Sequence, residues 1–210
     1  MTGKQGFGPL DSLRFAEPLA SQLRFLLEAD RLKSVIRGNR IADGSRRENT
    51  AEHSWHIALF ALVLAPHAVE QVDVLRVVSM LQIHDLVEID SGDTLLYDAA
   101  GAAMQAVRES VAARRLFGLL PAGQASEFLS LWQEFEAAVT ADARFAKSVD
   151  RLQPILLNHA AGGGTWTDYD VDEARERALT GRIAEGSPAL WSAAEKVIED
   201  AVRRGWLKPA

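Results

Sequence analysis

The 210-residue chain contains no cysteine, so disulfide bonds, thiolate zinc sites and a cysteine nucleophile are excluded. Any metal site must therefore use histidine and carboxylate ligands. Long apolar runs are also lacking, since the longest, IALFALVLA at 57–65, has about half the length of a membrane-spanning helix. The N-terminal MTGKQGFGPLDSLRF lacks the apolar segment of a signal peptide. We therefore expect a cytoplasmic protein with no membrane partner.

Basic residues are fewer than acidic ones, with 23 Lys and Arg against 29 Asp and Glu. The formal net charge is -6, which argues against duplex nucleic acid as a partner. A hydrophobic content of 48% with 25% charged residues is typical of a globular protein, and the length suits one domain. Residues 1–17 are rich in glycine at their start and predict a flexible arm, so we place a single domain at 18–210.

Helical periodicity dominates the remaining sequence. Apolar residues recur at spacings of three to five, and no segment shows the alternation of a strand. We therefore predict an all-α bundle, in which Asn49 or Thr50 caps a helix that ends at Pro66, and Pro154 kinks a later one. The other predicted helices cover 20–35, 73–88, 99–119, 122–139, 142–160, 171–183 and 187–206.

The stretch LQIHDLVEIDSGDT at 81–94 places titratable groups beside apolar residues. His84, Asp85 and Glu88 lie near the end of a predicted helix, and Asp93 follows about one turn later. Adjacent residues on a helix diverge by about 100°, so His84 and Asp85 need further ligands from other helices to close a metal site. His53, near a helix start, and Asp150, in mid-helix, are the candidates.

These residues resemble the HD-domain metal-dependent phosphohydrolase family. RLKSVIRGNRIADGSRRENTAEHS and HDLVEIDSGDT are similar to its small 5'-deoxynucleotidase branch, and the resemblance covers about residues 26–164. It implies an HD-domain helical bundle that binds one divalent ion. The implied metal ligands are His53, His84, Asp85 and Asp150, with Glu88 and Asp93 around the attacking water and substrate, and Arg37 at the substrate. Bacterial members of the branch often have Trp after that arginine, where this chain has Gly38.

The chemistry of such a site can also be argued from the side chains. Imidazole and carboxylate ligands suit Mn, Co, Fe, Ni or Zn, and Mg stays open as well. Hydrolysis of a phosphate monoester benefits from a metal that offsets phosphoryl charge, while Glu88 or Asp93 orients the water or moves a proton. Arg37, Arg46 and Arg47 offer the planar donors that phosphate favours. We expect a small phosphorylated substrate, most simply a (deoxy)nucleoside 5'-monophosphate.

Several alternatives stay open. The same fold suits a nucleotide phosphodiesterase, and a regulatory protein can hold metal or nucleotide without turnover. His84 and Asp85 can also form a buried pair that only stabilises a helix end. His56, three residues after His53, is a candidate to support a ligand. We also expect a homodimer, because the C-terminal helices carry apolar residues that could form an interface. The same residues could instead pack onto the chain's own core. They are Leu190, Trp191, Val197, Ile198 and Trp206.

Overall fold

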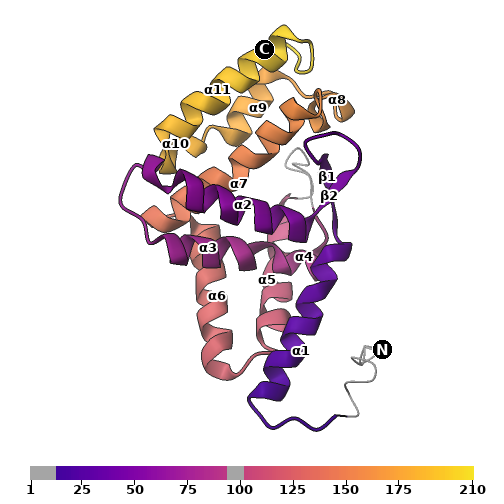
Figure 1. The fold of residues 1–210 in the computed structure, drawn as a ribbon, viewed down its shortest axis with the longest axis vertical. Helices are drawn as coiled ribbons and strands as arrows, with labels where there is room; N and C mark the ends of the chain where they lie inside the picture. The colour runs from indigo at the N-terminus through magenta and orange to yellow at the C-terminus, as the bar shows by residue number, and fades with distance from the viewer. Residues whose placement is uncertain (1–12, 94–101) are drawn as a thin grey trace.

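Three helices form the centre of the molecule: α2 (Thr50–Leu64), α3 (Val74–Ile83) and α7 (Ala141–Ala160). Each contacts the other two, and Figure 1 shows α2 and α3 running side by side across α7. The computed structural model describes residues 13–93 and 102–210. Its helical architecture confirms the predicted all-α fold. Within the described stretches, no helix is both long and apolar enough to span a membrane.

The other helices extend this centre in two directions. Figure 1 shows α1, α5 and α6 at one end and α9 and α11 at the other. Residues 1–12 of the predicted arm, and 99–101 of a predicted helix, lie outside the described residues, and the domain boundary at residue 18 stays a prediction. The remaining bounds are α1 (Leu19–Ala29), η2 (Asp30–Ser34), η3 (Ala65–His67), α5 (Ala102–Phe117), α6 (Ala122–Ala137), α8 (Thr165–Asp168), α9 (Glu173–Thr180), α10 (Ile183–Gly186) and α11 (Pro188–Arg203).

A small hairpin corrects the expectation that no strand is present. Strands β1 (Ile36–Arg40) and β2 (Arg47–Asn49) pair antiparallel, with Ile36 opposite Asn49 and Arg40 opposite Arg47. Apolar alternation is missing because β2 reads Arg-Glu-Asn and buries only Glu48. The backbone ladder holds this hairpin together, and hydrophobic periodicity cannot reveal such a pairing.

The helix predicted over 73–88 is also interrupted. α3 ends at Ile83, and the chain tightens into the 3-10 turn η4 (His84–Val87) before α4 (Glu88–Ser91). The Nδ1 atom of His84 lies 3.0 Å from the carbonyl oxygen of Leu81, so the side chain competes for a backbone acceptor of the helix. Tight turns inside helices often mark functional positions, and this one carries both His84 and Asp85.

Local signals place the two other ligand-bearing helices. The side chain of Asn49 accepts the N–H of Glu52, and Glu52 accepts the N–H of Asn49 in return, so this capping box starts α2 as predicted. His53 follows in the first turn of α2. Thr140 caps α7, which continues through Pro154 to its end and carries Asp150 near its middle.

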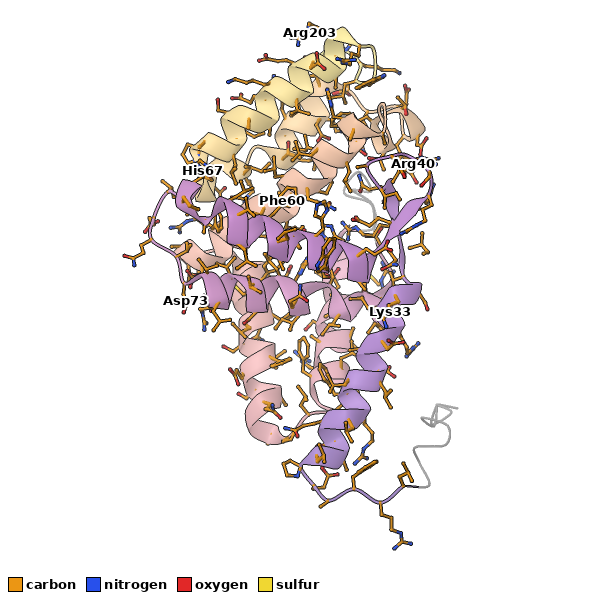
Figure 2. The ribbon with its side chains drawn as sticks, viewed as in Figure 1. Lys33, Arg40, Phe60, His67, Asp73 and Arg203 are labelled. Atoms are coloured by element: carbon orange, nitrogen blue, oxygen red, sulfur yellow. The ribbon has the colours of Figure 1, made fainter. Side chains whose placement is uncertain are left out.

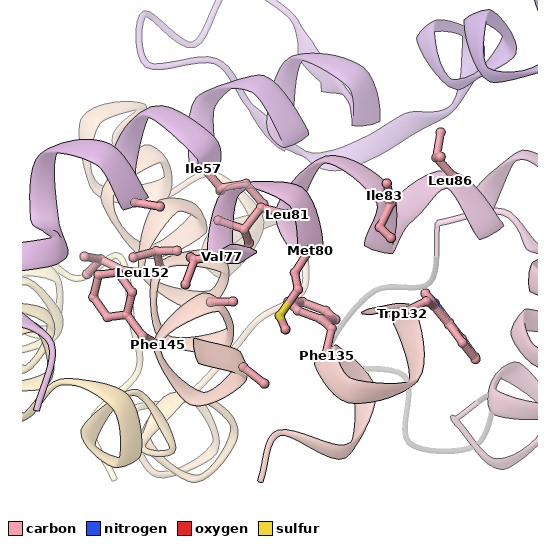
Figure 3. Close-up of a cluster of buried hydrophobic side chains, with 14 of the residues drawn as sticks. Ile57, Val77, Met80, Leu81, Ile83, Leu86, Trp132, Phe135, Phe145 and Leu152 are labelled. Carbon is pink, nitrogen blue, oxygen red and sulfur yellow. The ribbon is translucent and has the colours of Figure 1, made fainter. Parts of the chain in front are cut away.

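Buried apolar side chains hold these helices in register. Figure 3 shows residues of α2, α3, α6 and α7 meeting in one cluster, in which Ile57, Val77, Met80 and Leu81 have no exposed surface. Ile57 lies one turn after His53, and Leu81 lies one turn before His84. The core therefore fixes the positions of the metal-ligand candidates.

Candidate metal centre

The structure brings together the four side chains that the sequence suggests as metal ligands. Donor atoms of His53, His84 and Asp150 all lie within 4.8 Å of one another. Asp150 Oδ1 is 3.0 Å from Nε2 of His53 and 3.6 Å from Nε2 of His84. Asp85 lies beside them, 2.9 Å from His84 Nε2 and 3.8 Å from His53 Nε2. We call these four residues the ligand cluster.

Hydrogen bonds orient both imidazole rings for metal binding. Nδ1 of His53 lies 3.1 Å from Oε1 of Gln153, and Nδ1 of His84 lies 3.0 Å from the Leu81 carbonyl. Both partners are acceptors, so each Nδ1 carries a hydrogen and each Nε2 faces the cluster. Two nitrogen donors and the Asp150 carboxylate, with Asp85 beside them, fit a divalent transition metal, and the Nδ1 contacts are those that ligating histidines usually make.

A buried network behind His53 was not anticipated from the sequence. Gln153 donates to Oε1 of Glu48 over 2.8 Å, and its amide nitrogen lies 3.2 Å from Nδ1 of His56. His56 therefore contacts Gln153 and not a ligand candidate directly, and its supporting role stays a prediction. Gln153 is fully buried and Glu48 nearly so. In the sequence, the one indication that Gln153 lies near the site is its position one turn after Asp150, on the same face of α7.

Glu48 also has an unusual buried atom. In the described part of the chain its Oε2 makes no hydrogen bond, and neither does Nε of Arg37, 3.9 Å away. The same Oε2 is 3.7 Å from Nδ1 of His53. Glu48 therefore places a carboxylate between the arginine and the histidine without a direct hydrogen bond to either.

The ligand cluster holds opposite charges in close contact. Burial alone would lower the pKa of His84, but Asp85 and Asp150 raise it to about 10. Burial alone would raise the pKa of Asp85, but His84 lowers it to about 2. The histidines likewise hold the pKa of Asp150 well below its ordinary value, despite burial. A divalent ion held by these residues would supply positive charge to the two carboxylates in place of the histidine protons.

Glu88 and Asp93 lie next to this cluster around one arginine. Nη1 of Arg37 is 3.3 Å from Asp85 Oδ2, 3.8 Å from Asp93 Oδ1 and 3.9 Å from Glu88 Oε1. The hydroxyl of Thr50 donates to Glu88 over 2.9 Å. Burial, followed by the charge of Asp85, raises the pKa of Glu88 well above its ordinary value. Burial also raises the pKa of Asp93, although Arg37 opposes the shift. Carboxyl groups with raised pKa values can carry a proton near neutral pH.

A cavity of about 280 Å³ opens onto these residues, and three elements supply most of its wall. Arg37, Glu88 and Asp93 line it, together with three of the four ligand-cluster residues. Arg46 and Arg47 lie elsewhere: both are exposed, and Arg46 pairs with Glu52 over 2.7 Å. The described cavity wall from β1, η4 and α7 consists of Arg37, Asn39, His84, Asp85, Val87, Lys147, Asp150, Arg151, Pro154, Ile155 and Asn158.

A family model, curated proteins and solved structures all give related matches. Residues 29–191 match the model of the HD domain. The human 5'-deoxynucleotidase HDDC2 is 29% identical over 137 residues, which cover 65% of this chain and 66% of the human protein. The bovine protein of that name is 30% identical over 135 residues, which cover 64% of either chain. A crystal structure described as a predicted metal-dependent phosphohydrolase from Magnetospirillum magnetotacticum MS-1 is 51% identical, with a TM-score of 0.86, and the match covers 91% of this chain and 98% of that one.

Proposed function

Because this chain belongs to the HD domain family, we propose that it is a metal-dependent phosphohydrolase that releases phosphate from a (deoxy)nucleoside 5'-monophosphate or a similar small phosphomonoester. The convergence of the ligand cluster at the wall of a cavity is the observation that carries this proposal. The names of the curated relatives support the substrate class. A divalent ion held there would supply positive charge to the phosphoryl oxygens and make water more acidic.

Arg37 is the residue that we propose to bind the phosphate. Its Nη1 lies within 4.0 Å of three carboxylates, and its side chain is only 13% exposed. These carboxylates hold the guanidinium beside the ligand cluster before any substrate arrives, so little side-chain entropy is lost when a phosphate oxygen binds. A guanidinium also matches the planar geometry of two phosphate oxygens.

Glu88 is the favoured residue for proton transfer. The leaving alkoxide needs a proton, and a buried carboxyl with a strongly raised pKa can supply one. The hydroxyl of Thr50 fixes one oxygen of Glu88, which leaves the other on the side of Arg37. Asp93, close to the same guanidinium, is placed to orient water or substrate.

The test uses metal-stripped protein refilled singly with Mn, Co, Fe, Ni, Zn or Mg and a panel of nucleoside 5'-monophosphates. We expect metal-dependent phosphate release that is lost in Asp85→Ala and kept in Asp30→Ala, a change at an exposed helical position paired with Lys33. Release that persists in Asp85→Ala at full metal content would contradict the proposal. Cleavage of cyclic nucleotides without phosphate release would favour a phosphodiesterase, and nucleotide binding without turnover would favour a regulatory protein.

The homodimer and the cytoplasmic location stay predictions. The structure buries Leu190 and Ile198 of α11 in the chain's own core, so these residues do not supply an interface. Large exposed apolar side chains lie on α2 instead, for example Trp55, Leu62 and Val63, which are each at least 59% exposed. Light scattering of the purified protein checks the oligomeric state, and cell fractionation checks the location.

A further inference from the structure

The cavity is longer than a metal ion and a phosphate group require. Its α7 wall continues from Asp150 through Pro154 and Ile155 to Asn158. Eight residues of helix span roughly 12 Å. Phosphate chemistry takes place at the Asp150 end, so the rest of this wall faces the part of the substrate that does not react.

Asn39 lies next to the phosphate-binding arginine on this wall. It is two residues after Arg37 on β1, and both side chains line the cavity. The strand pairing is irregular between Ile36 and Arg40, so the lining of the cavity, and not strand alternation, shows that both side chains face it. In a nucleoside 5'-monophosphate the sugar follows the phosphate directly, through one ester oxygen and one methylene group. With the phosphate at Arg37, the sugar would extend along the cavity wall that Asn39 also lines.

A buried network fixes the orientation of the Asn39 amide. Nδ2 of Asn39 donates to Oδ1 of Asn158 over 2.9 Å. That oxygen also accepts the backbone N–H of Thr165 at 3.1 Å, and Nδ2 of Asn158 donates to the Thr165 hydroxyl at 2.8 Å. A backbone N–H can only donate, so the Asn158 amide cannot flip. Asn39 must then turn its NH₂ group toward Asn158. In the described part of the chain, no donor reaches its Oδ1.

The surrounding backbone is built around the same contact. Gly164 has φ +48°, and a Cβ atom there would lie 2.5 Å from Oδ1 of Asn158. Arg40, labelled on the hairpin in Figure 2, faces Asp168 of α8 at 4.0 Å and so links the hairpin to the segment that carries Thr165. β1, α7 and α8 therefore hold Asn39 in one place, which is what selective binding requires.

We propose that Asn39, positioned by Asn158, binds a hydroxyl group of the substrate's sugar and so selects among phosphomonoesters. An amide that presents an oxygen and one remaining N–H suits a hydroxyl, which both donates and accepts, whereas an uncharged side chain is a weak partner for a second phosphate. The inference rests on the proposed phosphohydrolase function and adds the group that this site recognises beside the phosphate.

The experiment compares kcat/KM of wild type and Asn39→Ala on four substrates. Three are ribo-, 2'-deoxy- and 2',3'-dideoxynucleoside 5'-monophosphates of one base, and the fourth is p-nitrophenyl phosphate, which has no sugar. Asn158 keeps its Thr165 contacts in this variant, so we expect the fold to survive. Ser45→Ala, an exposed change in the same hairpin, is the matched control.

We expect Asn39→Ala to lose about 3- to 10-fold in kcat/KM for a substrate that carries the recognised hydroxyl. The values for the dideoxynucleotide, and for p-nitrophenyl phosphate, should stay within about two-fold, and Ser45→Ala should match wild type throughout. An equal loss on all substrates, or no loss on any, would overturn the sugar contact while leaving the hydrolase in place. If wild type with every metal released no phosphate from any of the four, the proposed function itself would fail, and the sugar contact with it.

Discussion

The carboxylate of Glu48 gives direction to a chain of hydrogen bonds that ends at the ligand cluster. A carboxylate group accepts, so Gln153 turns its NH₂ toward Glu48 and its Oε1 toward His53. The Nδ1 of His53 must then donate, which leaves Nε2 for a metal. Glu48→Gln keeps the size of the side chain but removes this direction, because two facing amides can pair in either orientation. In the orientation that still accepts from Gln153, the new NH₂ group points toward Arg37 and His53 instead.

The expected loss follows from the contacts involved. Hydrogen bonds to charged groups contribute about 1.5–3 kcal/mol, and one such bond of 2.8 Å links Glu48 to Gln153. Removing the partner of a metal-ligating histidine typically weakens metal binding by about 10- to 100-fold, or about 1.4–2.7 kcal/mol. We expect the Kd of Glu48→Gln for Mn or Co to rise by that factor, as measured by competition with a chelating indicator.

The reasoning fails if Glu48→Gln binds the metal as tightly as wild type while its thermal unfolding stays cooperative. Glu70→Gln is the charge-matched control, because Glu70 is exposed and pairs with Arg144 away from the cavity. An equal weakening in Glu70→Gln would assign the effect to net charge and would also contradict the role of Glu48.

Three further outcomes test the stability of the fold and the site. Burial alone would raise the pKa of Glu28, but hydrogen bonds from Arg115 and a second arginine lower it below its ordinary 4.5. The carboxylate therefore stabilises the fold above pH 4.5, so the Tm difference between wild type and Glu28→Gln should be present at pH 7 and shrink as the pH falls through the folded pKa. Gly164→Ala should lower the free energy of unfolding, measured with urea, by about 1–3 kcal/mol or more, because Gly164 has a positive φ and an added Cβ atom would clash with Asn158. Metal at 100 times its Kd should stabilise wild type by about 2.7 kcal/mol, and this gain should be absent in His84→Ala.

Most of the helices could be predicted from the sequence because they follow from local apolar periodicity, whereas the full set of four ligand candidates came from the family resemblance. Apolar periodicity identifies buried residues such as Ile57 and Leu81; His53 lies one turn before Ile57 on α2, and His84 follows Leu81 by three residues, directly after the end of α3. Once those residues meet in a core, the histidines must approach each other. Asp150 needed the family resemblance, since nothing in its own neighbourhood distinguishes it from a surface aspartate.

The hairpin and the turn after α3 escaped prediction for a physical reason. β2 is stabilised by pairing with β1 and by the burial of a single side chain, so its sequence carries no alternating pattern. η4 depends on the contact between His84 and the Leu81 carbonyl, which competes with continuation of the helix. Both features depend on hydrogen bonds, which hydrophobic periodicity does not detect.

The residues behind the reacting groups are the hardest to find from sequence, although they decide how the site is oriented. Gln153 contacts Glu48 from 105 positions away, and Asn158 contacts Asn39 from 119. Both are uncharged residues of α7 that look like ordinary helix positions. Both reach the hairpin, where Gln153 donates to Glu48 of β2 and Asn158 accepts from Asn39 of β1. The hairpin, which hydrophobic periodicity does not reveal, therefore contacts both networks, one of which reaches His53 while the other lines the cavity.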